Sequence, residues 1–261
     1  MIGVFDSGIG GLTVVRALKG QLPQYDIVYF GDTARTPYGT KSPETVIQYA
    51  VEDAEILLEK GAQILVVACN SASSVATEAL RERFDVPILE VISPAVQMAV
   101  SDPKRTRVGV IGTRATVNSG IYNDKIRALR PESAVYSQPC PLLVPLVEEG
   151  WIKRGETRKI VKKYLHPLKL KRIDVLILGC THYPLLKEII QVKIGKRVKV
   201  IDSSEALSAE VMAFLRENSD VDSRLTKGGT CRFYVSDVTE QFQKVANSIL
   251  KRGATLEHIK L

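Results

Sequence analysis

Two short apolar runs, each closed by a small residue, a cysteine and polar side chains, constrain the fold of this chain more than any other feature. The first spans residues 62–71 (AQILVVACNS) and the second spans residues 173–182 (IDVLILGCTH). Runs of this length and composition are typical of buried strands in a parallel sheet. Open α/β sheets bind ligands at the carboxyl ends of their strands, which is where Cys69 and Cys180 stand. The two segments therefore predict one site with a thiol on each side.

Strand-like and helix-like segments alternate along most of the chain, and the pattern starts twice. Residues 107–112 (RVGVIG) repeat the character of residues 1–6 (MIGVFD), and a cysteine-ended strand follows each at a similar distance. Alternation of this kind implies parallel sheets with helices on both faces. We predict an α/β fold of two pseudo-symmetric α/β domains, each a mostly parallel sheet flanked by helices, with the active site in the cleft between them.

The domain boundaries follow from this duplication. Residues 1–93 together with residues 206–261 are predicted to form the first domain, and residues 94–205 the second. The strand predicted at residues 232–235 and the last helix are too little chain for a third domain, so we expect them to complete the first. The tail at residues 253–261 shows little pattern, and we expect it to be partly loose.

Composition and cysteine spacing narrow the class of protein. The chain is 45% apolar and 25% charged, as soluble globular proteins are. Its four cysteines include no C-x-x-C pair, and its three histidines stand at no zinc-ligand spacing, so we expect neither a disulfide scaffold nor a metal site. No apolar run approaches the ~20 residues that span a membrane, and the chain opens on a strand without a basic leader. We therefore expect a cytoplasmic protein with no membrane partner.

The net charge of +7 is concentrated in residues 153–172. Such a stretch is either a solvated helix face or a nucleic-acid footprint. No recognised nucleic-acid motif accompanies the charges, so we favour the solvated face and expect nucleic-acid binding at most as a secondary activity. Only Glu156 opposes the nine basic residues, which are Lys153, Arg154, Arg158, Lys159, Lys162, Lys163, Lys169, Lys171 and Arg172.

The residues beside the two cysteines suit acid–base chemistry on a carboxylate ligand. Cys69 precedes a predicted helix, whose positive N-terminal end favours a thiolate, while Asn70 and Ser71 add donors suited to a carboxylate. A lone buried cysteine is often inert, but Cys180 in the matching place favours a functional pair. His182 stands two residues from Cys180, where an imidazole can tune a thiol or exchange a proton with it; the alternative is a helix cap.

Polar residues that follow other predicted strands point to the same edge. Asp6 ends the first strand beside Ser7, where it could bind a substrate ammonium, assist a base or cap the next helix. The glycine-rich turn at residues 8–11 lacks the ending of a phosphate loop, so we expect it to hold a carboxylate on backbone amides. Asp32 and Tyr38 lie in a polar loop after a further strand and could reach a ligand.

Five blocks of the chain resemble bacterial glutamate racemases. All stand in the family's order, and the resemblance extends from residue 2 to about residue 242. Ser71 stands where the family usually has threonine, which keeps the hydroxyl and loses a methyl. The blocks are residues 5–11 (FDSGIGG), 31–39 (GDTARTPYG), 68–73 (ACNSAS), 140–150 (CPLLVPLVEEG) and 178–186 (LGCTHYPLL).

The resemblance implies a cofactor-free enzyme that interconverts L- and D-glutamate and supplies D-glutamate for peptidoglycan synthesis. The Cα–H bond is a very weak acid, so inversion needs a base on one face and an acid on the other. An unperturbed cysteine titrates near 8.5, so modest activation suffices. The resemblance assigns the proton of D-glutamate to Cys69, assisted by Asp6, and the proton of L-glutamate to Cys180, assisted by His182.

The resemblance also implies a homodimer, no cofactor or metal, and opening of the domains for substrate access. Three alternatives remain. One is another acidic amino acid such as aspartate as substrate. The others are a dithiol redox protein, whose two cysteines would approach within about 7 Å between Cα atoms, and a basic nucleic-acid-binding protein that acts through residues 153–172. Asp32 and Glu148 are implied as secondary polar members of the site. The implied substrate-binding residues are Asp6, Ser7, Tyr38, Gly39, Asn70, Ser71, Thr181 and His182.

Overall fold

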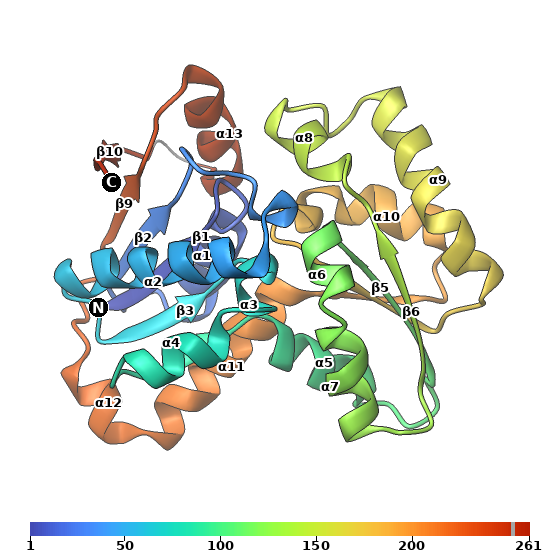
Figure 1. The fold of residues 1–261 in the computed structure, drawn as a ribbon, viewed down its shortest axis with the longest axis horizontal. Helices are drawn as coiled ribbons and strands as arrows, with labels where there is room; N and C mark the ends of the chain where they lie inside the picture. The colour runs from blue at the N-terminus through green and yellow to red at the C-terminus, as the bar shows by residue number, and fades with distance from the viewer. Residues whose placement is uncertain (252–253) are drawn as a thin grey trace.

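The structure is a computed structural model that describes residues 1–251 and 254–261. Strands alternate with helices, and the strands build two separate sheets (Figure 1). The first sheet has the strand order β10-β9-β2-β1-β3-β4 and the second has the order β6-β5-β7-β8. Every pairing in both sheets is parallel. The predicted fold class, two α/β units with parallel sheets, is confirmed.

The strands of the first sheet come from both ends of the chain, and those of the second from its middle. The first sheet contains β1 (Ile2–Asp6), β2 (Ile27–Gly31), β3 (Ile64–Val67), β4 (Ile88–Glu90), β9 (Cys231–Val235) and β10 (Leu256–His258). The second sheet contains β5 (Arg107–Gly112), β6 (Ala134–Pro139), β7 (Val175–Gly179) and β8 (Lys199–Asp202). The domain boundaries themselves stay a prediction.

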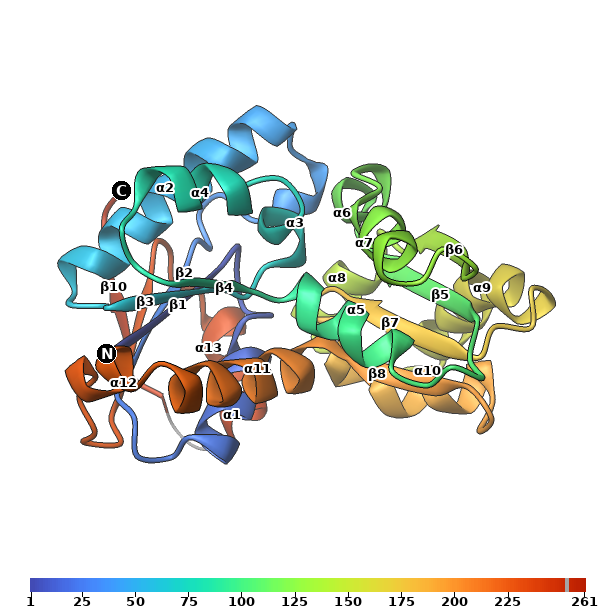
Figure 2. The same ribbon diagram turned by 90° about the horizontal axis from the view of Figure 1, so that it is seen from below.

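Helices cover both faces of each sheet (Figure 2). On the first sheet, α2 (Pro43–Glu59) and α4 (Thr77–Arg83) pack on one face, and α1 (Leu12–Gln21), α11 (Ser203–Glu217) and α13 (Glu240–Leu250) pack on the other. On the second sheet, α5 (Ile92–Val100) and α7 (Ile121–Leu129) pack opposite α8 (Leu143–Glu148), α9 (Gly155–Leu170) and α10 (Lys187–Ile194). The remaining short helices are η1 (Tyr38–Thr40), α3 (Asn70–Ser73), α6 (Arg114–Asn118), η2 (Tyr183–Leu186) and α12 (Ser219–Arg224).

Local sequence signals account for several helix ends. Ser42 caps α2 by accepting a hydrogen bond from the Thr45 amide, with Pro43 in the first turn, and Gly61 follows the helix with a φ of +89°. Asp202 caps α11 by accepting from the Ser204 amide at 3.0 Å. Serine and aspartate are both residue types that commonly cap helices in this way.

The two halves share one apolar core. Val4 of β1 and Val110 of β5 belong to the same buried cluster, which α1, α5 and α11 connect. Figure 2 shows α11 beside α1 and close to α5, and α11 packs against both. Because this core lies on one side of both sheets, it joins the halves while leaving the carboxyl ends of β3 and β7 free to face a common cavity.

The C-terminal segment completes the first sheet. As predicted, the returning strand β9 pairs with β2. The expectation of a partly loose tail is wrong for β10, because Leu256 to His258 pair with Phe233 to Val235 and so gain backbone hydrogen bonds at the sheet edge. Gly253, the first residue of that tail, lies outside the described residues.

The basic stretch forms the outer side of α9. Its lysines and arginines are exposed, whereas Thr157, Val161, Leu165 and Leu168 are buried against the second half. This is the arrangement of a solvated amphipathic helix. Within residues 1–251 and 254–261, no helix is both long and apolar enough to cross a membrane.

Candidate active site

A small closed cavity lies between the two halves, and both predicted cysteines line it. Its volume is about 20 Å³, which is room for roughly one water molecule. An amino acid is much larger, so substrate must reach the cysteines through a more open arrangement of the halves. The lining residues are Ser7, Pro37, Gly39, Cys69, Asn70, Ser71, Thr113, Val144, Cys180, Thr181 and His182.

Cys69 follows β3 and stands at the start of α3. Its side chain is buried, and its Sγ lies 3.6 Å from the Ser7 hydroxyl. Burial and the charge of Asp6 raise the pKa of Cys69 to about 12, outweighing the hydrogen bonds from Ser7 and Ala72 that lower it. The Ala72 amide at the start of α3 does lower the pKa of Cys69, as the sequence predicts for a helix N-terminus, but burial and Asp6 outweigh it. The reason is that α3 has only four residues, and its few amide donors do not offset desolvation.

Cys180 follows β7 and lies in a different electrostatic setting. Its Sγ is 3.7 Å from His182 Nδ1, and His182 Nε2 is 3.2 Å from Glu148 Oε1. Burial lowers the pKa of His182, but Cys180 and Glu148 together outweigh it and raise this pKa to about 10. His182 is therefore placed to exchange a proton with the Cys180 sulfur. The two thiols thus face the same cavity with different neighbours, Ser7 and Asp6 near Cys69 and His182 near Cys180.

The carboxylate of Asp6 ties the glycine-rich turn to the opposite half. It is fully buried, accepts from the amides of Gly8 at 3.1 Å and Gly11 at 2.9 Å, and accepts from the Thr181 hydroxyl at 3.1 Å. Burial raises the pKa of Asp6, against the lowering effect of His182 and these hydrogen bonds. The turn therefore holds a carboxylate on backbone amides, as the sequence predicts, but the carboxylate is the chain's own Asp6.

Two residues expected at the ligand lie instead in a buried network beside it. The hydroxyl of Tyr38 donates to Asp32 and, at 2.8 Å, to Asp53, and Arg35 pairs with both of these carboxylates. Neither Tyr38 nor Asp32 is among the described residues that line the cavity. Their hydrogen bonds fix the loop that carries Gly39, which does line it.

Sequence reasoning missed a group of hydroxyls on the second half. Thr113 Oγ1 lies 3.0 Å from the Ser71 hydroxyl and 3.1 Å from that of Thr116. A signal for Thr113 was present, because it follows β5 just as Ser7 follows β1 in the duplicated unit. Pro37 and Val144, which also line the cavity, carry no comparable signal.

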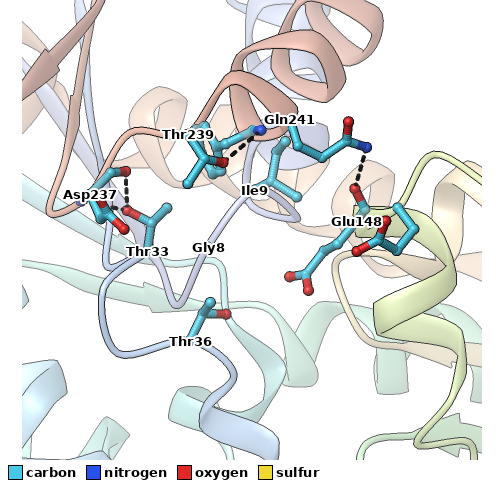
Figure 3. Close-up of a pocket in the computed structure, with 10 residues that line it drawn as sticks. Gly8, Ile9, Thr33, Thr36, Glu148, Asp237, Thr239 and Gln241 are labelled. Atoms are coloured by element: carbon cyan, nitrogen blue, oxygen red, sulfur yellow. Dashed lines mark hydrogen bonds between the residues drawn. The ribbon is translucent and has the colours of Figure 1, made fainter.

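A second, larger pocket lies behind Glu148, with a volume of about 260 Å³ (Figure 3). Gly8, Thr36 and Gln241 are among its lining residues, and Gln241 donates to the Glu148 carbonyl at 2.9 Å. Neither cysteine lines this pocket. Glu148 thus connects the histidine beside Cys180 with this larger pocket, whereas both cysteines line the smaller cavity.

No metal site accompanies these groups within the described part of the chain. Residues 1–251 and 254–261 contain no group of three or more His, Cys, Asp or Glu side chains placed to hold a metal ion.

The different surroundings of the two cysteines predict selective alkylation, because burial and Asp6 raise the pKa of Cys69 to about 12. Both are 5% exposed, so differences in reactivity with iodoacetamide near neutral pH report mainly the thiolate fraction. Cys180 should be alkylated at least about tenfold faster than Cys69, as followed by mass spectrometry of the proteolysed protein. His182→Asn should slow the reaction of Cys180 and leave that of Cys69 unchanged. Equal rates in the unaltered protein would contradict the raised pKa of Cys69.

The sequence of this chain is similar to those of known racemases. Residues 12–211 match the Asp/Glu/Hydantoin racemase family. The chain is 46% identical over 260 residues to the glutamate racemase of Persephonella marina, covering 100% of this chain and 97% of that protein.

Solved structures give the same result. A glutamate racemase isoform from Bacillus anthracis superposes with a TM-score of 0.94 at 35% identity, covering 100% of this chain and 97% of that one. The glutamate racemase of Francisella tularensis in complex with D-glutamate superposes with a TM-score of 0.91 at 41% identity, covering 99% and 97%. This chain therefore belongs to the Asp/Glu/hydantoin racemase family and is an amino-acid racemase, an isomerase.

Proposed function

We propose that this protein is a glutamate racemase that interconverts L- and D-glutamate without a cofactor, using Cys69 and Cys180 as opposed acid and base. One observation carries the proposal: two buried thiols from different halves line one small cavity, Cys69 beside the Ser7 hydroxyl and Cys180 beside the His182 imidazole. Two-base inversion needs a protonated group on one face of Cα and a deprotonated group on the other. The full-length similarity to glutamate racemases supports glutamate as the substrate.

In this proposal Cys180 is the base for L-glutamate, because the His182 imidazole stands beside its sulfur. The Cys180 thiolate removes the Cα proton of L-glutamate, and the Cys69 thiol delivers a proton to the opposite face. D-glutamate leaves with Cys180 as thiol and Cys69 as thiolate, which is the form that accepts D-glutamate in the reverse reaction. Protonated His182 stabilises the thiolate of Cys180, while the Ser7 hydroxyl, 3.6 Å from the Cys69 sulfur, can stabilise the thiolate there.

The cavity also suits the charge that develops on the substrate. Deprotonation at Cα moves negative charge onto the α-carboxylate, which needs hydrogen-bond donors around it. Ser71 and Thr181 line the cavity and supply hydroxyl donors. Because the cavity has room for roughly one water molecule, these donors act at a lower dielectric than that of bulk water, so each contact is stronger.

The proposal extends to the setting of the enzyme. The family resemblance favours a cytoplasmic homodimer that supplies D-glutamate for peptidoglycan synthesis. Analytical ultracentrifugation of the full chain tests the dimer independently of the activity.

The direct test is circular dichroism of L-glutamate, D-glutamate and L-aspartate incubated with the protein and no added cofactor. We expect both glutamate enantiomers to reach an equal mixture. Aspartate should react about 10- to 100-fold more slowly, since one methylene changes transition-state binding by this order. Faster turnover of aspartate would favour the alternative acidic substrate, and no turnover of either amino acid would refute the proposal.

A further inference from the structure

Asn70 presents an unusual amide to the cavity. It is 2% exposed, and its Oδ1 accepts a hydrogen bond from the Tyr122 hydroxyl at 2.7 Å. Its Nδ2 has no hydrogen-bond partner among residues 1–251 and 254–261. A buried donor without an acceptor is costly, so native proteins rarely keep one that no ligand uses. Because Asn70 lines the cavity between the thiols, the unpaired amide marks the place of an acceptor on the substrate.

Tyr122 is held firmly enough to direct that amide. Its ring is 2% exposed and belongs to the core shared by the two halves. It also packs on Gly179, where an added Cβ would lie 3.1 Å from the tyrosine Cε2. Gly179 is the residue immediately before Cys180 in the chain. The fixed position of the tyrosine ring determines where its hydroxyl lies.

The hydroxyl selects one of the two orientations of the amide. With Oδ1 toward Tyr122, the hydroxyl hydrogen has an acceptor at 2.7 Å. With the amide turned round, that buried hydrogen would lose the one acceptor that the described residues provide for it. Retaining the tyrosine hydrogen bond therefore leaves the NH₂ group of Asn70 for the ligand.

The two residues stand on opposite halves of the molecule. Asn70 begins α3 at the end of β3, whereas Tyr122 lies on α7, which covers the second sheet. Their hydrogen bond therefore exists only when the halves are in contact. Opening for substrate access would break it and free the amide to rotate.

We propose that Tyr122 is a positioning residue, whose hydroxyl orients the Asn70 amide so that Nδ2 donates to a carboxylate oxygen of the substrate in the closed site. The inference rests on the proposed function, since it takes glutamate as the ligand. In this arrangement, closure of the two halves also turns the Asn70 amide so that its Nδ2 faces the substrate carboxylate. Substrate that accepts from Nδ2 in turn stabilises the closed arrangement.

The test compares Tyr122→Phe, Asn70→Ala and the double variant in glutamate racemisation. Tyr122→Phe keeps the ring and its packing but removes the hydroxyl. A positioned donor that binds ground state and transition state alike acts on KM. We expect KM to rise roughly tenfold in each single variant, with kcat changed less than about threefold. The double variant should show no further rise, because both changes remove the same interaction.

Tyr25→Phe is the matched control. It also removes the hydroxyl of a buried tyrosine that donates to a side chain, in this case Asp222 of α12, away from the cavity. Its KM should equal that of the unaltered protein. Thermal unfolding followed by circular dichroism establishes whether each variant is folded. If Tyr122→Phe does not fold, Asn70→Ala still tests the same interaction.

Three outcomes are distinguishable. An unchanged KM in Tyr122→Phe overturns the inference, and so do effects of Tyr122→Phe and Asn70→Ala that multiply in the double variant. Absence of glutamate turnover in the unaltered protein overturns the proposed function and this inference with it. A shared, non-additive rise in KM, absent in Tyr25→Phe, supports it.

Discussion

Cys69→Ser and Cys180→Ser should each slow the inversion of glutamate by at least about 10³-fold, since general acid–base groups contribute 10²–10⁴-fold and a serine hydroxyl is a far poorer base than a thiol. Both directions should fall by the same factor in each variant. Each direction uses both thiols, one as base and one as acid, and the equilibrium constant between enantiomers is one. Circular dichroism of L- and D-glutamate measures the two rates.

Proton exchange in D₂O separates the roles of the two thiols. In Cys69→Ser, the Cys180 thiolate can still remove the Cα proton of L-glutamate and return a deuteron to the same face. NMR should therefore show deuterium entering L-glutamate without inversion, and little entering D-glutamate. In Cys180→Ser the pattern should reverse and be slower near neutral pH, because burial and Asp6 raise the pKa of Cys69 to about 12.

Cys140→Ser is the matched control for the loss of a buried thiol. Cys140 is also buried, and its Sγ donates to the Gln138 carbonyl at 3.5 Å rather than lining the small cavity. It should retain racemisation. If Cys69→Ser and Cys180→Ser both matched the unaltered protein, the assignment of the paired thiols would be wrong.

Gly10→Ala should lower kcat/KM by about 100-fold or more, because displacing catalytic groups by about 1 Å costs this order. A Cβ at Gly10 would lie 2.2 Å from Thr181 Oγ1 and 2.6 Å from His182 Nδ1. Both side chains would have to move, although Thr181 holds Asp6 and His182 holds Cys180. Crowding of this kind should also lower the free energy of unfolding by about 1–3 kcal/mol.

Gly20→Ala provides the control for a glycine-to-alanine change. Gly20 lies in α1, where an added Cβ would meet nothing within 4 Å. Alanine should raise the free energy of unfolding by about 0.5–1 kcal/mol through its helix propensity and leave kcat/KM unchanged. Urea unfolding and glutamate kinetics measure both effects. Full activity in Gly10→Ala would show that Thr181 and His182 need not stand where the closed structure holds them.

Much of the architecture could be predicted because its signals are local. The apolar runs at β3 and β7, the cap at Ser42 and the cap at Asp202 each depend on a few neighbouring residues, and all agree with the structure. The exceptions have little local signal. β6 is only half-buried and lacks a continuous apolar run, and β10 is a strand of three residues.

The candidate site divides in the same way. Strand ends are readable from sequence, so most residues expected at the ligand, from Ser7 to His182, do line the cavity. Tyr38 and Asp32 do not, because Arg35 and Asp53 capture their polar groups. These contacts join Tyr38 and Arg35 of the loop to Asp53 in the middle of α2, and no local sequence pattern indicates them. The roles of the site residues stay predictions until the variants are measured.

The sequence by itself determined the duplicated parallel sheets and a cysteine at the end of a strand in each half, since strand periodicity and strand-end position are properties of contiguous residues. Only the tertiary structure decided the raised pKa of Cys69, the burial of Asp6 by its own turn, and the contact of Tyr122 with Asn70. A pKa and an amide orientation depend on desolvation and on groups brought close from distant parts of the chain. The contact of Tyr122 with Asn70, in addition, exists only once the two halves have closed on each other.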